Sequence, residues 1–430
     1  MIAPARRAAV DALQLVDEDG LDLGAAVARV RDTLADDRDR ALLLELVGGT
    51  LRMRGAIDYQ LAQRLTRPLH KLDAAVLRIL RLSGFQLLYL SRLPASAVIN
   101  DAVELTRRAG KTSAAGLTNA VLRALNKARE AMTWPPQEPL ADYLAVVHSH
   151  PGWLVQRWLS RYGADATERW LCFNNAPADL CLATNTRLIR RDALAAELAE
   201  AGVATRPTAR APHGLVVVDG RPLATAAFRE GKFVVQDEAS QLIAALAGPP
   251  PGTRVLDLCA SPGGKTVSMS AAAGEVVACD VRPHRVRLLA RTLSRCQARN
   301  VAVVHVPAEG ALPFRPESFD VVLVDAPCSG LGTVRRDPDI KWKRSPADLE
   351  RFAAGQRDLL VRAAVLVKPG GRLIYATCSS EPEENQDVAS AFLAAHPQFA
   401  LVHTHQTLPC VDDLEAFFGV VLERAPAARA

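Results

Sequence analysis

The sequence lacks the features that mark membrane, secreted and metal-binding proteins. Its 430 residues contain no run that approaches the roughly 18 consecutive apolar residues of a membrane helix. The N-terminus carries Arg6 and Arg7 but reaches the acidic residues 17–19 without an apolar segment, so we expect no secretory signal peptide. The eight cysteines are irregularly spaced and form no C-x-x-C pair, which argues against a disulfide framework and a structural zinc site. These absences predict a cytoplasmic protein with free thiols and no bound metal.

Aromatic residues and net charge are also scarce. Aromatic residues make up 5% of the chain, and 52 Lys and Arg residues against 47 Asp and Glu residues leave a net charge of only +5. The charge is unevenly spread, because residues 52–129 hold fourteen basic and four acidic side chains, a net charge of +10. Such an excess supplies the salt-dependent part of nucleic-acid affinity. A solvated helical face would carry the same charge, so the count alone leaves RNA binding and a plain surface both open.

Two smaller basic clusters lie further along the chain. The first repeats at every fourth position, as on one face of a helix, and we interpret it as a solvent-exposed ridge. It consists of Arg287, Arg291, Arg295 and Arg299. The second surrounds Trp342 and directly follows a candidate active-site loop, which favours a functional role. It consists of Arg335, Arg336, Lys341, Lys343 and Arg344.

Hydrophobic periodicity divides the chain into three predicted regions. Residues 1–140 repeat apolar side chains at helical spacing and predict an all-α domain. Its helices are expected to break at Gly48-Gly49, Pro68, Pro94 and Gly110. Residues 145–247 predict a small α+β module. Its expected elements are helices at 153–162 and 191–201 and strands at 180–185 and 215–218.

Residues 248–430 show a regular alternation of strands and helices. The expected strands cover 254–258, 275–279, 301–306, 320–324 and 372–376, and the expected helices include 283–298 and 346–367. Strands of near-continuous apolar character are buried on both faces, so we predict a Rossmann-like α/β domain with a doubly wound parallel sheet. In the strand order 3-2-1-4-5, the first, fourth and fifth strands are neighbours, and ligands bind at their carboxyl ends.

The motif D-L-C-A-S-P-G-G-K-T at residues 257–266 joins the first strand to a helix. Its paired glycines let the backbone approach a ligand closely. A phosphate-binding P-loop would need glycine where Cys259 stands, and the dinucleotide motif G-x-G-x-x-G is absent. Asp280 ends the second strand, where an acidic side chain can hold ribose hydroxyls. This combination suits an adenosyl ligand without a triphosphate, and S-adenosylmethionine is the obvious candidate.

Two cysteines follow neighbouring strands of the predicted sheet. Cys328 lies in D-A-P-C-S-G at 325–330, after the fourth strand, and Cys378 lies in T-C-S-S at 377–380, after the fifth. A single cysteine is ordinarily a small buried apolar residue. Two of them at adjacent strand ends favour chemistry instead, and we expect both thiols to meet in one pocket with Asp325.

These motifs resemble those of the RNA cytosine-5 methyltransferases. The resemblance rests on D-A-P-C-S-G followed by R-R-D-P-D-I-K-W, on Y-A-T-C-S with P-E-E-N, and on the loop at 257–266. Residues 235–242 resemble the lead-in helix of that family. The segments 95–105 and 116–123 resemble an RNA-binding domain of the NusB type. That fusion is the arrangement of the 16S ribosomal RNA methyltransferase B (Sun/Fmu) family, and the resemblance covers nearly the whole chain.

The resemblance implies S-adenosylmethionine-dependent methylation of cytosine C5 in 16S ribosomal RNA by a monomeric enzyme, with the target base unpaired or flipped. It assigns Cys378 as the nucleophile that attacks C6, Cys328 as the residue that assists release, and Asp325 as the group that orients the cytosine edge and the methionine amino group. Asp280 would hold the ribose, and Glu309 stands where the family usually has an Asp near the adenine. The methionine moiety would lie against Cys259, Ala260, Ser261, Pro262, Gly263, Gly264 and Lys265.

Three alternatives remain open from the sequence. The two cysteines could exchange roles, because Pro327-Cys328 matches the Pro-Cys nucleophile of DNA cytosine methyltransferases. The substrate could be transfer RNA, which the catalytic motifs do not exclude. The protein could also be a non-catalytic RNA-binding or antitermination module, as the helical domain alone would suggest.

Overall fold

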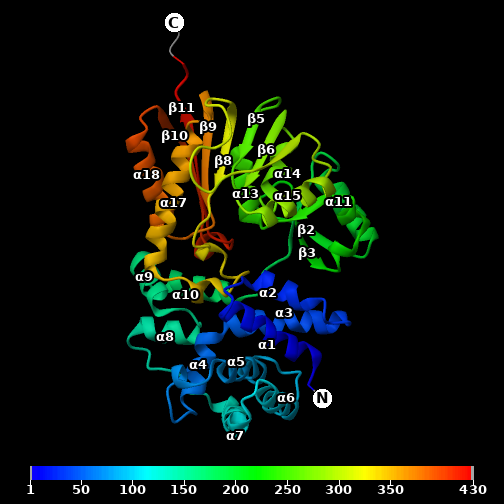
Figure 1. The fold of residues 1–430 in the computed structure, drawn as a ribbon, viewed down its shortest axis with the longest axis vertical. Coiled ribbons are helices and arrows are strands. Elements are labelled where there is room, and N and C mark those ends of the chain that lie inside the picture. The colour runs from blue at the N-terminus through cyan, green and yellow to red at the C-terminus, as the bar shows by residue number, and fades with distance from the viewer. Residues whose placement is uncertain (1, 428–430) are drawn as a thin grey trace. The chain divides into compact units, whose positions relative to one another are not determined.

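The computed structural model describes residues 2–427 (Figure 1). Contacts within the chain divide it into two compact units, one of Met1–Pro177 with Val334–Arg344, and the other of Ala178–Thr333 with Ser345–Ala430. The chain therefore leaves the second unit after Thr333, contributes residues 334–344 to the first unit, and returns at Ser345. None of the helices described between residues 2 and 427 combines the length and the apolar character needed to cross a membrane.

The first unit is helical, as predicted for residues 1–140. Its longer helices are α1 (Pro4–Asp17), α2 (Leu23–Arg31), α3 (Asp37–Arg52), α4 (Arg54–Ala62), α5 (Ala74–Tyr89), α6 (Ala95–Arg108), α7 (Ala115–Lys127), α8 (Leu140–Val147), α9 (Gly152–Tyr162) and α10 (Ala164–Asn175). Short turns of helix are η1 (Leu69–Lys71), η2 (Thr112–Ala114), η3 (Arg129–Ala131) and α16 (Ile340–Lys343). One apolar core joins α1 to α7, with Leu46, Ile57 and Leu80 fully buried in it.

Local sequence fixes several of these helix boundaries. The side chains of Asp22, Asp36 and Asp73 accept hydrogen bonds from backbone N–H groups at the starts of α2, α3 and α5. The predicted break at Gly48-Gly49 is wrong, because α3 continues through both residues. A Cβ atom at Gly49 would lie 1.9 Å from Cζ of Phe85, so this glycine makes room for an aromatic ring from α5.

The second unit begins with a four-stranded antiparallel sheet in the order β2-β3-β1-β4. Its strands are β1 (Cys181–Thr184), β2 (Ala204–Pro207), β3 (Gly214–Asp219) and β4 (Phe233–Val235), and its helices are α11 (Arg191–Glu200), η4 (Pro222–Ala224) and α12 (Ala226–Arg229). Leu194 and Leu198 of α11 pack on Leu182 and Phe233 of the sheet. The α+β character predicted for this part of the chain is thereby confirmed.

The larger sheet of the second unit has the strand order β10-β11-β9-β8-β5-β6-β7. Its strands are β5 (Arg254–Asp257), β6 (Glu275–Asp280), β7 (Val301–His305), β8 (Phe319–Asp325), β9 (Val367–Thr377), β10 (Phe399–Thr407) and β11 (Phe417–Arg424). Strands β5 to β9 pair in parallel, which confirms the predicted 3-2-1-4-5 order. The C-terminal strands β11 and β10 extend that sheet by antiparallel pairing beyond β9.

Helices cover both faces of this sheet (Figure 1). They are α13 (Glu238–Ala247), α14 (Gly264–Ser270), α15 (Pro283–Arg295), α17 (Pro346–Ala364), η6 (Pro382–Glu384) and α18 (Gln386–Ala395), with η5 (Leu331–Thr333) and α19 (Pro409–Asp412) in loops. Val255 and Leu256, adjacent in β5, lie in different apolar cores, as expected for a strand buried on both faces. The central strands β5, β8 and β9 are neighbours, so the loops that leave their carboxyl ends start side by side.

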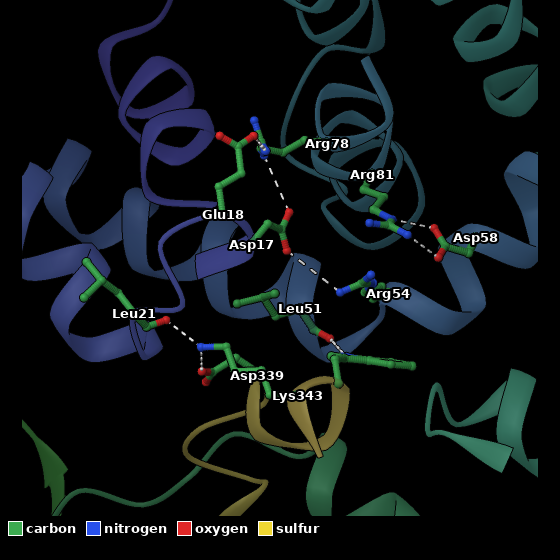
Figure 2. A network of polar contacts seen from close by, with 11 residues as sticks. Asp17, Glu18, Leu21, Leu51, Arg54, Asp58, Arg78, Arg81, Asp339 and Lys343 are labelled. Carbon is green, nitrogen blue, oxygen red and sulfur yellow. Dashed lines mark hydrogen bonds and ion pairs between the residues drawn. The ribbon is translucent and has the colours of Figure 1, made fainter. Parts of the chain in front are cut away.

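The inserted segment 334–344 is held in the helical unit by its basic and aromatic side chains (Figure 2). Lys341 Nζ donates to the carbonyl of Arg52 at 3.0 Å, and Trp342 Nε1 donates to the carbonyl of Leu51 at 2.6 Å. These carbonyls belong to the last turn of α3, where a helix leaves its C=O groups without partners from the helix itself. Lys341 is fully buried. The cluster around Trp342, which the sequence favoured as functional, therefore includes residues that fasten the chain to the helical unit.

Candidate active site

Two thiols lie together at the carboxyl ends of β8 and β9. Cys328 and Cys378 are both half-buried, and their Sγ atoms are 3.3 Å apart. Backbone hydrogen bonds hold the two loops against each other, since Ala326 N donates to Ala376 O and Gly332 N donates to Cys378 O. The predicted convergence of the two cysteine motifs is confirmed by this geometry.

Gly332 is required where the two loops meet. A Cβ atom at this position would lie 1.9 Å from the carbonyl oxygen of Ala416 and 2.8 Å from that of Cys378. Any larger residue would push the backbone after Cys328 away from the backbone of Cys378. The second glycine of the C-S-G-L-G run therefore serves the close approach of the two cysteine loops.

The two thiols cannot ionise independently. The hydrogen bond with Cys378 and, after it, burial raise the pKa of the Cys328 thiol well above its usual range. Two thiolates at this separation would repel each other strongly in a partly buried site. Cys328 is therefore the member of the pair that keeps its proton.

A buried cation lies beside this pair. Lys265 Nζ is 2.7 Å from Oδ2 of Asp325, which ends β8. Burial alone would lower the pKa of Lys265, but the charge and hydrogen bond of Asp325, together with the nearby Cys378, outweigh burial and raise it. Sequence reasoning placed Lys265 only in the cofactor loop. Its pairing with Asp325 follows from β5 and β8 being neighbours, since Asp325 ends β8 and Lys265 lies in the first turn of α14, the helix that follows β5.

The loop after β5 has the close-packed backbone expected of a cofactor-binding turn. Gly263 adopts φ of 109°, a conformation that favours glycine, and precedes α14. Ala260 N donates to Cys279 O, and the carbonyl of Ser261 accepts a hydrogen bond of 2.6 Å from Arg285. Burial raises the pKa of the Cys259 thiol, so this third cysteine remains protonated.

Several polar atoms around this loop suit an adenosyl ligand with an amino-acid tail. Within residues 2–427, Ser261 Oγ, Asp257 Oδ1 and Gln236 Oε1 are buried without a hydrogen-bond partner. Burial raises the pKa of Asp257 to about 7. Gln236 lies against Gly264, where an added Cβ would be 3.1 Å from its Oε1. Because unpaired buried polar groups are costly, these atoms fit a site that a polar ligand completes. Sequence reasoning gave neither Asp257 nor Gln236 a role in the site.

The remaining predicted cofactor residues differ in placement. Asp280 is buried at the end of β6, where its carboxylate accepts from the backbone N–H of Arg282 and lies 3.2 Å from Nε of Arg285. Glu309 is exposed in the loop after β7, and no hydrogen bond or ion pair described for residues 2–427 joins it to the other site residues. The structure thus joins the loop at 259–265 to Asp325 through Lys265 and brings the two cysteines together.

The basic side chains of residues 52–129 fall into an ion-paired group and an exposed group. Some of them form ion pairs within the helical unit, where Arg78 meets Asp17 and Glu18, and Arg81 meets Asp58 (Figure 2). Eight of the fourteen basic side chains are exposed. They are Arg67, Lys71, Arg92, Arg107, Arg108, Arg123, Lys127 and Arg129. Only these exposed side chains can contribute to a binding surface. The net charge of residues 52–129 therefore overstates the positive charge that they present to solvent.

Known families match three parts of the chain. Residues 3–127 match the NusB family, residues 150–224 match the ferredoxin-like domain of RsmF/B-like methyltransferases, and residues 244–416 match the 16S rRNA methyltransferase RsmB/F family. The ribosomal RNA small subunit methyltransferase B of Pseudomonas putida is 36% identical over 397 residues, which cover 91% of this chain and 89% of that protein. A probable methyltransferase B of Bacillus subtilis is 34% identical over 377 residues, 86% of this chain and 83% of that one.

Solved structures agree with these matches. The crystal structure of PH0851 aligns with a TM-score of 0.84 and 26% identity, and it covers 99% of both chains. A methyltransferase homolog protein from Pyrococcus horikoshii aligns with a TM-score of 0.59 and 24% identity, covering 67% of this chain and 99% of that one. The first of these alignments spans both units.

Proposed function

The chain belongs to the RsmB/F family of 16S ribosomal RNA methyltransferases, and we propose that it methylates carbon 5 of a cytosine in 16S ribosomal RNA through a covalent adduct of Cys378. Family membership makes the protein an S-adenosylmethionine-dependent ribosomal RNA methyltransferase. The choice of cytosine C5 and the adduct go beyond that membership. The observation that carries them is the pair of thiols 3.3 Å apart at the ends of β8 and β9.

The thiol pair suits the difficulty of this reaction. Carbon 5 of cytosine is too weak a nucleophile to take a methyl group directly. When the Cys378 thiolate bonds to C6, the electrons of the C5–C6 double bond become available at C5, and one hard step is divided into easier ones. S-adenosylmethionine, when bound, supplies the methyl group from its sulfonium. The C5 proton then leaves, the S–C6 bond breaks, and the double bond and the thiolate are restored.

The surroundings of the two thiols favour Cys378 as the nucleophile over the reversed assignment. Cys378 lies close enough to Lys265 to contribute to the raised pKa of the lysine. A neighbouring cation stabilises a thiolate, which favours Cys378 as the nucleophile. Cys328 instead has a raised pKa. Once Cys378 is bonded to C6, its hydrogen bond to Cys328 is lost, which removes the largest cause of that raised pKa. Cys328 can then give its proton to solvent and, as a thiolate, accept the C5 proton and so assist release.

The cofactor assignments extend this proposal. The loop of residues 259–265 would hold the methionine moiety, Asp280 the ribose and Glu309 the adenine side. Asp325, already paired with Lys265, would orient the cytosine edge and the methionine amino group. The target base has to leave any stack before a thiolate can reach C6, so an unpaired or flipped cytosine is the proposed substrate.

The eight exposed basic side chains of residues 52–129 are the proposed contribution of the helical unit to RNA binding. The NusB match over residues 3–127 supports this assignment, and it favours ribosomal RNA over transfer RNA. The remaining six basic residues of that stretch are half-buried or buried, so we do not assign them to the RNA surface.

Product analysis tests the proposal. Transcripts of 16S ribosomal RNA and of transfer RNA are incubated with the protein and S-adenosylmethionine, digested to nucleosides, and examined by mass spectrometry. We expect 5-methylcytidine in the ribosomal RNA alone, and we expect the Cys378→Ala variant to lose turnover by a factor of at least about 10⁴ while binding the cofactor normally. Methylation at another atom would refute the C5 assignment, and 5-methylcytidine in transfer RNA alone would refute the ribosomal substrate.

A further inference from the structure

A carboxylate is buried directly behind the two thiols. Glu384, the last residue of η6, has no exposed surface. The residues that follow the two cysteines, Ser329 and Ser379, are equally buried and both face this carboxylate. Glu384 therefore lies between the loop that carries Cys328 and the loop that carries Cys378.

Each oxygen of Glu384 accepts two hydrogen bonds. Oε1 accepts from the backbone N–H of Ser329 at 2.7 Å and from Nε2 of Gln356 at 3.1 Å. Oε2 accepts from the hydroxyls of Ser329 and Ser379, each at 2.5 Å. The two serines are also within 3.2 Å of each other. One carboxylate thus bridges the two loops at the positions next to the thiols.

Helix α17 completes the arrangement. Gln356 donates from the same nitrogen to the carbonyl of Pro327 at 3.0 Å, so the residue before Cys328 is held as well as the residue after it. Its Oε1 lies 3.1 Å from the hydroxyl of Tyr375, a fully buried residue of β9. The loop of Cys328 is therefore fixed on both sides by groups that depend on Glu384.

An ionised carboxylate is the group that satisfies all four donors. It offers acceptors only, whereas an amide of the same shape offers one acceptor oxygen and one donor nitrogen. In a Glu384→Gln variant, the amide nitrogen would face either the Ser329 N–H or the two serine hydroxyls. Burial raises the pKa of Glu384, and the hydrogen bonds from Ser329 and Ser379 oppose that rise.

We propose that Glu384 is a positioning residue that sets the separation of the two active-site thiols. It holds Ser329 and Ser379 on one carboxylate, and Sγ of Cys328 is thereby kept against Sγ of Cys378. The catalytic consequence rests on the proposed function, because the separation matters only if the two cysteines act in sequence on one base. The positioning itself does not depend on that function.

Two measurements on Glu384→Gln test the inference. Equilibration of the protein with reduced and oxidised glutathione, followed by alkylation and peptide mapping, gives the effective concentration of Cys328 toward Cys378. We expect this effective concentration to fall about tenfold. We also expect kcat for methylation to fall about 10- to 100-fold, with an unchanged Kd for S-adenosylmethionine by calorimetry. Loss of global structure would lower the cofactor affinity as well, so the split separates positioning from folding.

Matched variants keep the test decisive. Glu350→Gln removes an exposed carboxylate from the same helix as Gln356 and should change neither measurement. If Glu384→Gln fails to fold, Ser379→Ala removes the hydroxyl that donates to Glu384, together with its contacts to Glu381 N and Ser329 Oγ, and should still lower the effective concentration several-fold. An effective concentration equal to wild type in the folded variant would overturn the inference, as would a wild-type protein that forms no Cys328–Cys378 disulfide. A reduced effective concentration with unchanged kcat would support the positioning and refute the proposed roles of the cysteines.

Discussion

Two buried polar clusters, one around Glu384 and one around Lys341, belong to different units. In the second unit, the Glu384 carboxylate accepts four hydrogen bonds and binds the two thiol loops together. In the first unit, Lys341 is equally buried, and its Nζ donates to the carbonyl of Arg52 at the end of α3. Twelve residues separate Cys328 from Lys341. Positions of one motif therefore belong to different units.

The two clusters also differ in how their charge is compensated. Four donors surround Glu384 and oppose the rise in its pKa that burial causes. Burial and, after it, the charge of Arg52 lower the pKa of Lys341 well below its usual range. The hydrogen bonds around Glu384 offset part of the cost of burying a negative charge, whereas the charge of Arg52 adds to the cost of burying a positive charge on Lys341. Variants of the inserted segment should therefore change stability, while variants near the thiols should change turnover.

The largest effect that separates the two clusters is expected for Trp342→Ala. The variant removes a half-buried ring and the hydrogen bond from Nε1 to Leu51 O, and should lower the free energy of unfolding of the helical unit by about 2–3 kcal/mol. Denaturant titration followed by circular dichroism measures this loss. Trp342→Phe keeps an aromatic ring without the N–H group and should lose about 1 kcal/mol.

The turnover of Trp342→Ala tests whether the inserted segment affects stability alone. At temperatures where Trp342→Ala stays folded, kcat should remain close to wild type, because the thiol loops keep their own hydrogen bonds. A fall in kcat similar to that of Glu384→Gln would mean that the inserted segment acts on the active site.

An intermediate effect is expected from the exposed basic residues of the helical unit. Replacing Arg123, Lys127 and Arg129 together by Gln should weaken RNA binding about tenfold at low salt and reduce the dependence of affinity on salt. The Kd for S-adenosylmethionine should not change. Filter binding at several salt concentrations measures the RNA affinity.

The exposed members of the arginine ridge provide the matched comparison for that triple variant. Replacing Arg287, Arg291 and Arg299 by Gln removes three exposed charges from the second unit and should change RNA affinity little. Equal loss of RNA affinity in both triple variants would show that the helical unit contributes no more to RNA binding than the second unit does.

The smallest effect concerns the pH dependence of stability through Lys341. Its pKa is lowered in the folded state, so the unfolded chain binds more protons below an ordinary lysine pKa of about 10.4, and stability should rise with pH toward that value. Lys341→Met removes this contribution. The wild type should therefore gain stability over the variant as the pH rises from about 7 to 10, so the free energy of unfolding of the variant minus that of wild type should decrease. A difference that stays constant with pH would show that Lys341 is charged in the folded protein.

The sequence predicted most of the architecture because its signals are local. The apolar strands β5 to β9 and their order follow from runs that are buried on both faces. The C-terminal strands β10 and β11 were not predicted. In β10 most residues are exposed and the apolar residues 399–402 are followed by the polar residues 403–407, while β11 pairs antiparallel and lies outside the regular alternation of strands and helices. Likewise, Gly49 reads as a helix break in the sequence, although the ring of Phe85 is what requires it.

The part of the site that could be predicted consists of the residues that directly follow the parallel strands. Cys328 and Cys378 could be placed together because β8 and β9 are neighbours. The roles of Glu384 and Lys341 could not, since each depends on partners distant in the sequence, such as Ser329 and Arg52. The sequence also could not show that Arg78 and Arg81, within the basic stretch 52–129, form ion pairs inside the helical unit.

The proposed division of labour between the two cysteines is tested most directly by trapping the protein on its RNA. Each single variant is incubated with 16S ribosomal RNA and S-adenosylmethionine, and the mixture is separated under denaturing conditions. Cys328→Ala should accumulate a denaturant-resistant protein–RNA adduct, because Cys378 still attacks C6 but release is impaired, and Cys378→Ala should form none. An adduct that forms with Cys378→Ala and not with Cys328→Ala would contradict the account and assign the nucleophile to Cys328.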